Sequence, residues 1–192
     1  MTKSFILASA SPRRRELLQC IGLTFDVIPS DIDEIALEHE NPQEQVLRLS
    51  KEKSVSVARE NPARWVLGAD TIVVADRHIL GKPSALEEAR AMLTLLSGRT
   101  HSVITGYSIV NTDTDVMVHR TVESLVIFKD IDEDEKDWYV NSREPYDKAG
   151  GYAVQGMASY FVKEIQGSYT NVVGLPLCEV VTSLKEVGAI RF

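Results

Sequence analysis

The stretch "LASASPRRRELL", residues 7–18, joins a strand to a helix through a short turn near the start of the chain. The apolar run at 4–8 (SFILA) predicts the strand, and the small residues that begin with Ser9 predict the turn. Pro12 suits the first position of a helix, which we expect over 12–21. The N-terminus of that helix then directs free backbone N–H groups, and the positive end of its dipole, at whatever lies above the strand.

Three consecutive arginines, Arg13, Arg14 and Arg15, follow this turn in a chain that is acidic as a whole. Cations in the first turn of a helix oppose the helix dipole, and each costs about 0.3–1 kcal/mol unless an anion compensates. A phosphate would compensate, because free amides and the forked donors of arginine both suit its oxygens. The alternative is a solvated basic turn in which the arginines pair with acids on the surface.

Further strands and helices alternate along the rest of the chain. Short runs rich in Val and Ile predict strands at 4–8, 65–75, 100–111, 116–129 and 158–165. Apolar residues at helical spacing predict helices at 12–21, 42–60, 84–96, 132–141 and 173–187. The stretch 109–117 (IVNTDTDVM) predicts a hairpin. This order favours an α/β fold around a mixed, twisted sheet, as a single domain over residues 1–192 that could form two lobes.

Composition restricts where the protein works and what it binds. The chain has 21 Lys and Arg against 28 Asp and Glu, and its net charge of −7 disfavours nucleic acid and anionic membranes. Cys20 and Cys178 have neither the spacing of a metal site nor that of a disulfide framework, and no apolar stretch has the length of a membrane span. We therefore expect a cytoplasmic protein with no nucleic-acid or membrane partner, in which any bound anion is held by a local cluster.

Two charged residues interrupt apolar patterns. Asp70 falls inside "VLGADTIVV", which otherwise has the pattern of a fully buried strand. A buried, unpaired carboxylate costs several kcal/mol, so Asp70 needs a cation, a metal or several donors; the alternative is a strand-end Asp that caps a turn. Lys53 falls within the apolar stripe of the predicted 42–60 helix, where its side chain either reaches a polar site or extends past its neighbours to solvent.

Two loops carry further candidates. Lys82 in "LGKPSALEEA" lies in a strand-to-helix loop that suits a phosphate contact, although an ordinary loop would have the same spacing. "EPYDKAGGYAVQG", residues 144–156, places Asp147, Lys148 and Gln155 beside glycines that let backbone approach a ligand closely. A glycine-rich connection would explain the glycines but not those three polar residues.

Together these residues predict a site for a polyphosphate and a divalent metal, because Mg²⁺ is held by a few carboxylates, waters and the phosphates themselves. The chain lacks GxxxxGK[ST] and GxGxxG, which excludes a standard P-loop and the dinucleotide fingerprint. The charged candidates are Arg13, Lys53, Lys82, Lys148, Asp70 and Asp147.

The chain resembles the Maf family of nucleoside triphosphate pyrophosphatases. The matching stretches are "LASASPRRRELL", "GADT" (68–71), "LGKP" (80–83), "LSGRTHSVITG" (96–106), "EPYDKAGGYAVQG" and "GSYTNVVGLP" (167–176). The resemblance implies a two-lobed α/β fold similar to that of the inosine triphosphate pyrophosphatases, with a nucleotide cleft between the lobes and a homodimer as the common assembly. It also implies cleavage between the α and β phosphates, giving a monophosphate and pyrophosphate, with Mg²⁺ or Mn²⁺ as cofactor.

The resemblance also assigns roles to individual residues. Arg13, Thr71 and Gln155 match the subgroup that acts on dTTP and UTP, and Asp70 matches the proposed general base. The phosphate-binding candidates are Ser9, Arg13, Arg14, Lys53, Lys82 and Lys148, and the metal-binding candidates are Asp70, Asp147 and Glu34. Gly151 and Ser54 stand where the family usually has Ala, which changes little beyond local loop flexibility.

The expected function is hydrolysis of dTTP and UTP, or of modified pyrimidine nucleotides, for nucleotide-pool cleaning and cell-division arrest. One alternative is a pyrophosphatase that prefers other nucleotides, and another is a non-catalytic, nucleotide-responsive regulator of cell division. Two carboxylates that face a triphosphate would repel it unless a metal or the chemistry uses them, which argues against pure binding.

Overall fold

The structure, a computed structural model, describes residues 5–192, so Ser4 of the predicted 4–8 strand lies outside the described part. Its strands are β1 (Phe5–Leu7), β2 (Phe25–Val27), β3 (Val66–Ala75), β4 (His78–Leu80), β5 (Thr100–Asn111), β6 (Val116–Phe128) and β7 (Val162–Gln166). Its α-helices are α1 (Pro12–Cys20), α2 (Pro42–Glu60), α3 (Leu86–Leu96), α4 (Glu133–Val140), α5 (Tyr169–Val173) and α6 (Leu177–Glu186). Three short 3₁₀ helices follow α4: η1 (Pro145–Asp147), η2 (Ala149–Gly151) and η3 (Met157–Phe161).

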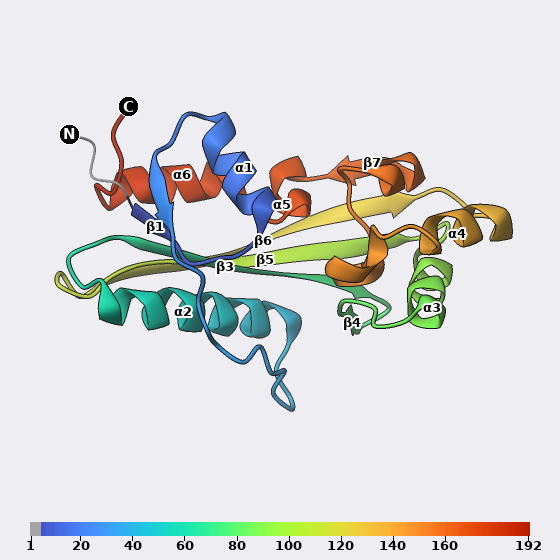
Figure 1. Cartoon of the computed structure of the whole chain (residues 1–192), viewed down its shortest axis with the longest axis horizontal. Coiled ribbons are helices and arrows are strands. Elements are labelled where there is room, and N and C mark those ends of the chain that lie inside the picture. The colour runs from blue at the N-terminus through green and yellow to red at the C-terminus, as the bar shows by residue number, and fades with distance from the viewer. Residues whose placement is uncertain (1–4) are drawn as a thin grey trace. The chain divides into compact units, whose positions relative to one another are not determined.

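The strands form one seven-stranded mixed sheet with the order β2-β1-β3-β5-β6-β7, and β4 pairs with β3 (Figure 1). β1 lies parallel to both β2 and β3, whereas β4 is antiparallel to β3 and β7 is antiparallel to β6. β5 and β6 are neighbours joined by a short turn, in agreement with the hairpin predicted at 109–117. The predicted α/β fold with a mixed sheet is therefore confirmed.

Two predicted elements differ from the structure. The helix predicted at 173–187 begins only at Leu177, as α6, because Gly174 takes φ 124° and Pro176 disfavours helical backbone at the residue before it; the short helix α5 that precedes this break was not predicted. The strand predicted at 158–165 starts only at Val162, after the 3₁₀ turn η3. β2 and β4 were missed because each has three residues, too few to show alternation.

The chain divides into two compact units. The first contains the described residues up to Asp70, together with Thr105–Val122 and Gly174–Phe192. The second contains Thr71–Ile104 and Glu123–Val173. Within residues 5–192, no helix is both long enough and apolar enough to cross a membrane.

In the first unit, α2 packs directly against the sheet through two glycines. A Cβ at Gly68 of β3 would lie 2.4 Å from the backbone oxygen of Ser50, and one at Gly106 of β5 would lie 2.4 Å from that of Val46. Figure 1 shows α2 running along β3 and β5. The backbone of the helix therefore rests on the backbone of the sheet, with no side chain between them at these two points.

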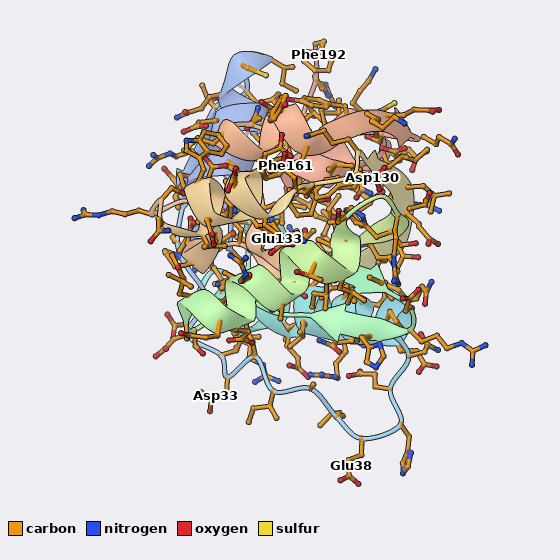
Figure 2. The ribbon with its side chains drawn as sticks, turned by 90° about the vertical axis from the view of Figure 1, so that its right-hand side faces the viewer. Asp33, Glu38, Asp130, Glu133, Phe161 and Phe192 are labelled. Atoms are coloured by element: carbon orange, nitrogen blue, oxygen red, sulfur yellow. The ribbon has the colours of Figure 1, made fainter. Side chains whose placement is uncertain are left out.

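The second unit has an aromatic core. Phe128, Tyr139, Tyr152 and Phe161 are all buried there and contact one another edge to face or at a tilt. α3 and α4 are joined at the surface by Arg90, which pairs with Glu133 at 2.5 Å and with Asp137. Figure 2 labels Glu133 of α4 and Phe161 of the aromatic core.

Candidate active site

The basic turn after β1 contains one buried arginine. Arg14 is 8% exposed; its Nε donates to the carbonyl of Gly174 at 2.8 Å, and its Nη1 donates to Ser9 Oγ at 3.1 Å and to the carbonyl of Ala69 at 2.7 Å. Burial lowers the pKa of the guanidinium, and the negative charges of Asp70 and Glu34 oppose that shift. Arg14 thus ties the strand-to-helix turn to β3 and to the segment before α6.

The other two arginines of the triplet are oriented differently. Arg13 is half-buried and Arg15 is exposed, whereas Ser9 is buried in the turn that follows β1. Ser9 Oγ accepts from Arg14 and, at 3.3 Å, from the backbone N–H of Ser11. The triplet is therefore neither a uniform phosphate cluster nor a uniform surface turn, because its middle member is a structural donor within the site.

Lys53 and two carboxylates form the centre of the site. Lys53 Nζ lies 2.6 Å from Asp70 Oδ1 and 2.7 Å from Glu34 Oε1, and the side chains of Lys53 and Asp70 are 7% and 9% exposed. Of the two possibilities for Lys53, the structure shows the polar site rather than extension to solvent. Asp70 is likewise a buried strand residue paired with a cation, not a capping residue at a strand end.

Local backbone geometry brings Lys53 to Asp70. Gly68 and Asp70 are two residues apart on β3, so their side-chain positions are on the same face of the strand, the face that contacts α2. Because Gly68 has no side chain, α2 approaches closely at Ser50 and Ser54, and Lys53 lies between these two residues in the sequence. "GADT" therefore combines a contact glycine with a buried acid.

Glu34 comes from the irregular segment between β2 and α2. Asp33 and Glu38, labelled in Figure 2, belong to the same segment. Arg48 of α2 holds this segment by pairing with Glu40 at 2.7 Å and by donating to the carbonyl of Ile35 at 2.9 Å. The side chain of Glu34 is 53% exposed, so the Lys53–Glu34 ion pair borders solvent.

The charges near the centre balance, with Arg14 and Lys53 opposite Asp70 and Glu34. Within residues 5–192, no three His, Cys, Asp or Glu side chains are grouped as a metal site. Mg²⁺ nevertheless needs only one or two carboxylates when phosphates and waters complete its shell. Asp70 and Glu34 converge on one point, the Lys53 ammonium, and this pair of oxygen donors fits such a cation.

The remaining candidates belong to the second unit. Lys148 Nζ donates to the carbonyl of Glu144 at 2.6 Å and pairs with Asp147, whose side chain is 68% exposed. The backbone N–H of Gly150 donates to the carbonyl of Gly81 at 2.9 Å, which joins this glycine-rich segment to the loop that carries Lys82.

The side chains of these candidates differ in exposure. Lys82 and Gln155 are exposed, and Thr71 is half-buried on β3. The structure thus brings Ser9, Arg14, Glu34, Lys53 and Asp70 together in the first unit, and places Asp147 and Lys148 side by side in the second.

Sequence reasoning missed a buried pair in the second unit. His101 Nε2 lies 2.7 Å from the hydroxyl of Tyr152, and the His101 ring meets Phe128 edge to face with centroids 4.9 Å apart. Burial lowers the pKa of His101 to about 4, so the imidazole is neutral near pH 7. The only signal in the sequence was a histidine within an apolar strand pattern, in the matching stretch "LSGRTHSVITG".

The chain is similar to known proteins over nearly its whole length. A family model described as "Maf-like protein" matches residues 4–187. A protein of Syntrophus aciditrophicus (strain SB) named dTTP/UTP pyrophosphatase is 55% identical over 192 residues, which cover 100% of this chain and 94% of that protein. A protein of Geotalea uraniireducens (strain Rf4) with the same name is 47% identical over 188 residues, which cover 98% of this chain and 97% of that one. The solved structure titled "The structure of the Staphylococcus aureus Ham1 protein" aligns over 66% of this chain and 72% of that chain, with a TM-score of 0.44 and 12% identity, too slight a likeness to bear on fold or function.

Proposed function

This chain belongs to the Maf-like protein family, and from that premise we propose that it hydrolyses dTTP and UTP to the nucleoside monophosphate and pyrophosphate. Relatives that it matches over nearly their whole length carry the name dTTP/UTP pyrophosphatase. The observation that carries the proposal is the buried Lys53–Asp70 pair, joined by Glu34, near Arg14 of the basic turn. A buried acid held by an ammonium supplies a base and a phosphate contact at one point.

In the proposed reaction, Asp70 orients a water molecule and takes its proton as the water attacks the α-phosphorus in line with the departing pyrophosphate. The Lys53 ammonium, 2.6 Å from Oδ1, fixes the direction of that carboxylate. An ammonium has three N–H donors, and Asp70 and Glu34 take two of them, so the third can donate to a phosphate oxygen.

Ser9 is proposed to donate to a phosphate. Its Oγ accepts from Arg14 and from the N–H of Ser11, which leaves its own proton to donate outward. Charge that develops on the leaving pyrophosphate would be stabilised by fixed cations. The proposed cations are Arg13, Arg14, Lys53, Lys82 and Lys148.

Asp70 and Glu34 would hold a divalent cation, Mg²⁺ or Mn²⁺, with Asp147 as a third candidate ligand. When bound, that cation would neutralise negative charge on the phosphates. Arg14 and Lys53 leave this charge uncompensated, because Asp70 and Glu34 already balance them. Asp147 contacts Lys148 in the structure, so its other proposed role is to fix the direction of that ammonium.

Base selection is assigned to Arg13, Thr71 and Gln155. A pocket that pairs with the imide edge of uracil or thymine rejects a base that leaves its polar groups unpaired.

We also propose that residues 1–192 act as a single domain, as a homodimer in the cytoplasm. Its proposed cellular roles are the removal of unwanted nucleotides and the arrest of cell division.

The test is pyrophosphate release from dTTP, UTP, CTP, ATP and GTP, each with Mg²⁺, with Mn²⁺ and with EDTA. Release that needs the metal and favours dTTP and UTP is expected. Asp70→Asn should abolish turnover but still bind a non-hydrolysable UTP analogue, since a neutral amide cannot take the proton. Full activity in that variant would exclude Asp70 as the base.

The specificity assignment has its own test. Gln155→Glu should change the ratio of UTP to GTP hydrolysis, because a carboxylate no longer offers the N–H donors of an amide. An unchanged ratio would remove Gln155 from the specificity set. No release from any of the five nucleotides would instead favour a modified substrate or the non-catalytic regulator.

A further inference from the structure

The segment from Glu144 to Ala158 carries Lys148 and Gln155, and the carboxylate of Glu144 closes it into a loop. Glu144 Oε2 accepts from the backbone N–H of Met157 at 2.9 Å, and Oε1 accepts from that of Ala158 at 3.2 Å. The first residue of the segment therefore binds the backbone at its far end.

The closure lies directly against the residue that follows Gln155. Gly156 takes φ 134° and ψ −155°, a backbone conformation that a residue with a side chain rarely adopts. A Cβ at Gly156 would lie 2.4 Å from Glu144 Oε2, so the carboxylate occupies the space that any side chain there would need. The direction in which Gln155 leaves the backbone is thus set by the turn that Glu144 holds.

The same residue also holds Lys148. The backbone carbonyl of Glu144 accepts from Lys148 Nζ at 2.6 Å, and the Lys148 side chain is 12% exposed. Glu144 therefore contacts both the proposed phosphate-binding lysine, through its carbonyl, and the turn after the proposed base-selecting glutamine, through its carboxylate.

Glu144 is itself fixed from the core. The hydroxyl of Tyr139, a fully buried residue of α4, donates to Oε1 at 3.1 Å. Burial raises the pKa of Tyr139, and the Glu144 carboxylate raises it further, so the phenol keeps its proton and remains a donor. Charge-assisted hydrogen bonds of this kind are roughly twice as strong as neutral ones. If Glu144 only stabilised the structure, it would make the same contacts, but replacing it would leave the preference for one base over another unchanged.

We propose that Glu144 is a positioning residue for base selection: by closing the 144–158 loop it fixes Gln155, and through its carbonyl it fixes Lys148. This proposal rests on the proposed function, since it deepens the account of how the same site selects a pyrimidine. Glu144 touches neither substrate nor metal in this role and acts only through the residues that it holds.

The experiment compares Glu144→Gln with Glu164→Gln, a matched change at an exposed glutamate of β7 whose carboxylate accepts from the side chain of Gln166. Hydrogen exchange measured by mass spectrometry reports the amides of Met157 and Ala158, and pyrophosphate release gives kcat/KM for UTP and for CTP. Glutamine keeps one acceptor oxygen but turns an NH₂ group toward a backbone donor, so one of these bonds is lost.

Loss of one such bond should raise exchange at Met157 and Ala158 about tenfold and lower the UTP to CTP ratio about tenfold in Glu144→Gln. Both should stay within about twofold of wild type in Glu164→Gln, since surface changes of this kind are usually small. Glu144→Asp keeps the charge on a shorter side chain, so its exchange at Met157 and Ala158 and its UTP to CTP ratio should fall between those of wild type and Glu144→Gln. It replaces Glu144→Gln in the comparison if that variant does not fold.

The outcomes separate this proposal from the one on which it rests. If wild type releases no pyrophosphate from UTP, the proposed function fails. If wild type is active and selective but the UTP to CTP ratio of Glu144→Gln is unchanged while its turn exchanges faster, Glu144 has only a structural role. Unchanged exchange at Met157 and Ala158 would show that the carboxylate does not close the loop.

Discussion

Replacing Gly68 with alanine should both destabilise the protein and separate Lys53 from Asp70. The new methyl group would lie 2.4 Å from the backbone oxygen of Ser50 and 2.7 Å from the backbone nitrogen of Ser54. Both atoms belong to the backbone of α2, so a side-chain rotation cannot relieve the contact. The helix as a whole, or β3, has to move.

The size of that movement follows from the contact distances. Ordinary contact begins near 3.4 Å, and 3.4 − 2.4 gives a displacement of about 1 Å at Ser50. Overpacking of this kind costs about 1–3 kcal/mol, and each kcal/mol lowers Tm by about 2–4 °C in a chain of this length. Displacement by about 1 Å of a group that positions a reactant can reduce the rate by up to about 10²-fold. Lys53 moves with the helix, so the 2.6 Å bond to Asp70 is stretched.

The assay pairs thermal unfolding with pyrophosphate release from UTP. Gly81→Ala is the control for stability, because a Cβ at Gly81 would meet nothing within 4 Å. Gly68→Ala should lower both Tm and kcat, whereas Gly81→Ala should change the free energy of unfolding by less than about 0.5 kcal/mol. A Gly68→Ala protein with wild-type Tm and kcat would refute the argument that backbone contact at Gly68 holds Lys53 against Asp70.

Two further predictions concern buried charged and titratable groups. Arg14→Lys should cost about 1–3 kcal/mol, because an ammonium cannot reproduce the forked contacts to Ala69 and Gly174, so at least one of these charge-assisted bonds is lost; a loss below about 0.5 kcal/mol in urea unfolding would contradict this. The pKa of His101 is lowered from 6.5 to about 4, so the unfolded chain takes up the proton first and stability falls as the pH drops from about 6.5 to about 4. His101→Gln should lack this loss, which is up to about 3 kcal/mol in wild type, and equal pH dependence of unfolding in the two proteins would count against it.

The sequence predicted those parts of the fold and site that depend on side-chain pattern. Alternating apolar runs located the long strands and helices, and the two charges that break apolar patterns, Asp70 and Lys53, proved to be partners. The inference that Asp70 needs a partner rests on the cost of burying a charge without a counterpart, whereas the position of Lys53 left a side chain extended to solvent as the alternative. That cost applies whatever the tertiary arrangement is, so it can be recognised before the structure is known.

Features that depend on backbone groups could not be predicted from the sequence. It did not show which of the three arginines is buried, because the acceptors of Arg14 are the carbonyls of Ala69 and Gly174, and every residue has a carbonyl. The role of Glu144 was missed for the same reason, since its carboxylate binds the N–H groups of Met157 and Ala158. Backbone partners of this kind are brought together by the tertiary structure, and the residue types in the sequence do not reveal them.

The bond from Arg14 to Gly174 spans 160 positions and has a consequence for synthesis. The unit that contains both residues also includes the last stretch of the chain, Gly174–Phe192, whereas the second unit ends at Val173. Because domains fold as their residues leave the ribosome, we expect the second unit to resist protease on stalled nascent chains before the N-terminal segment does. Equal, early protection of the strand-to-helix turn in chains that stop before Gly174 would contradict this order. The basic turn thus gains this contact only after Gly174, 160 positions further along the chain, has been synthesised.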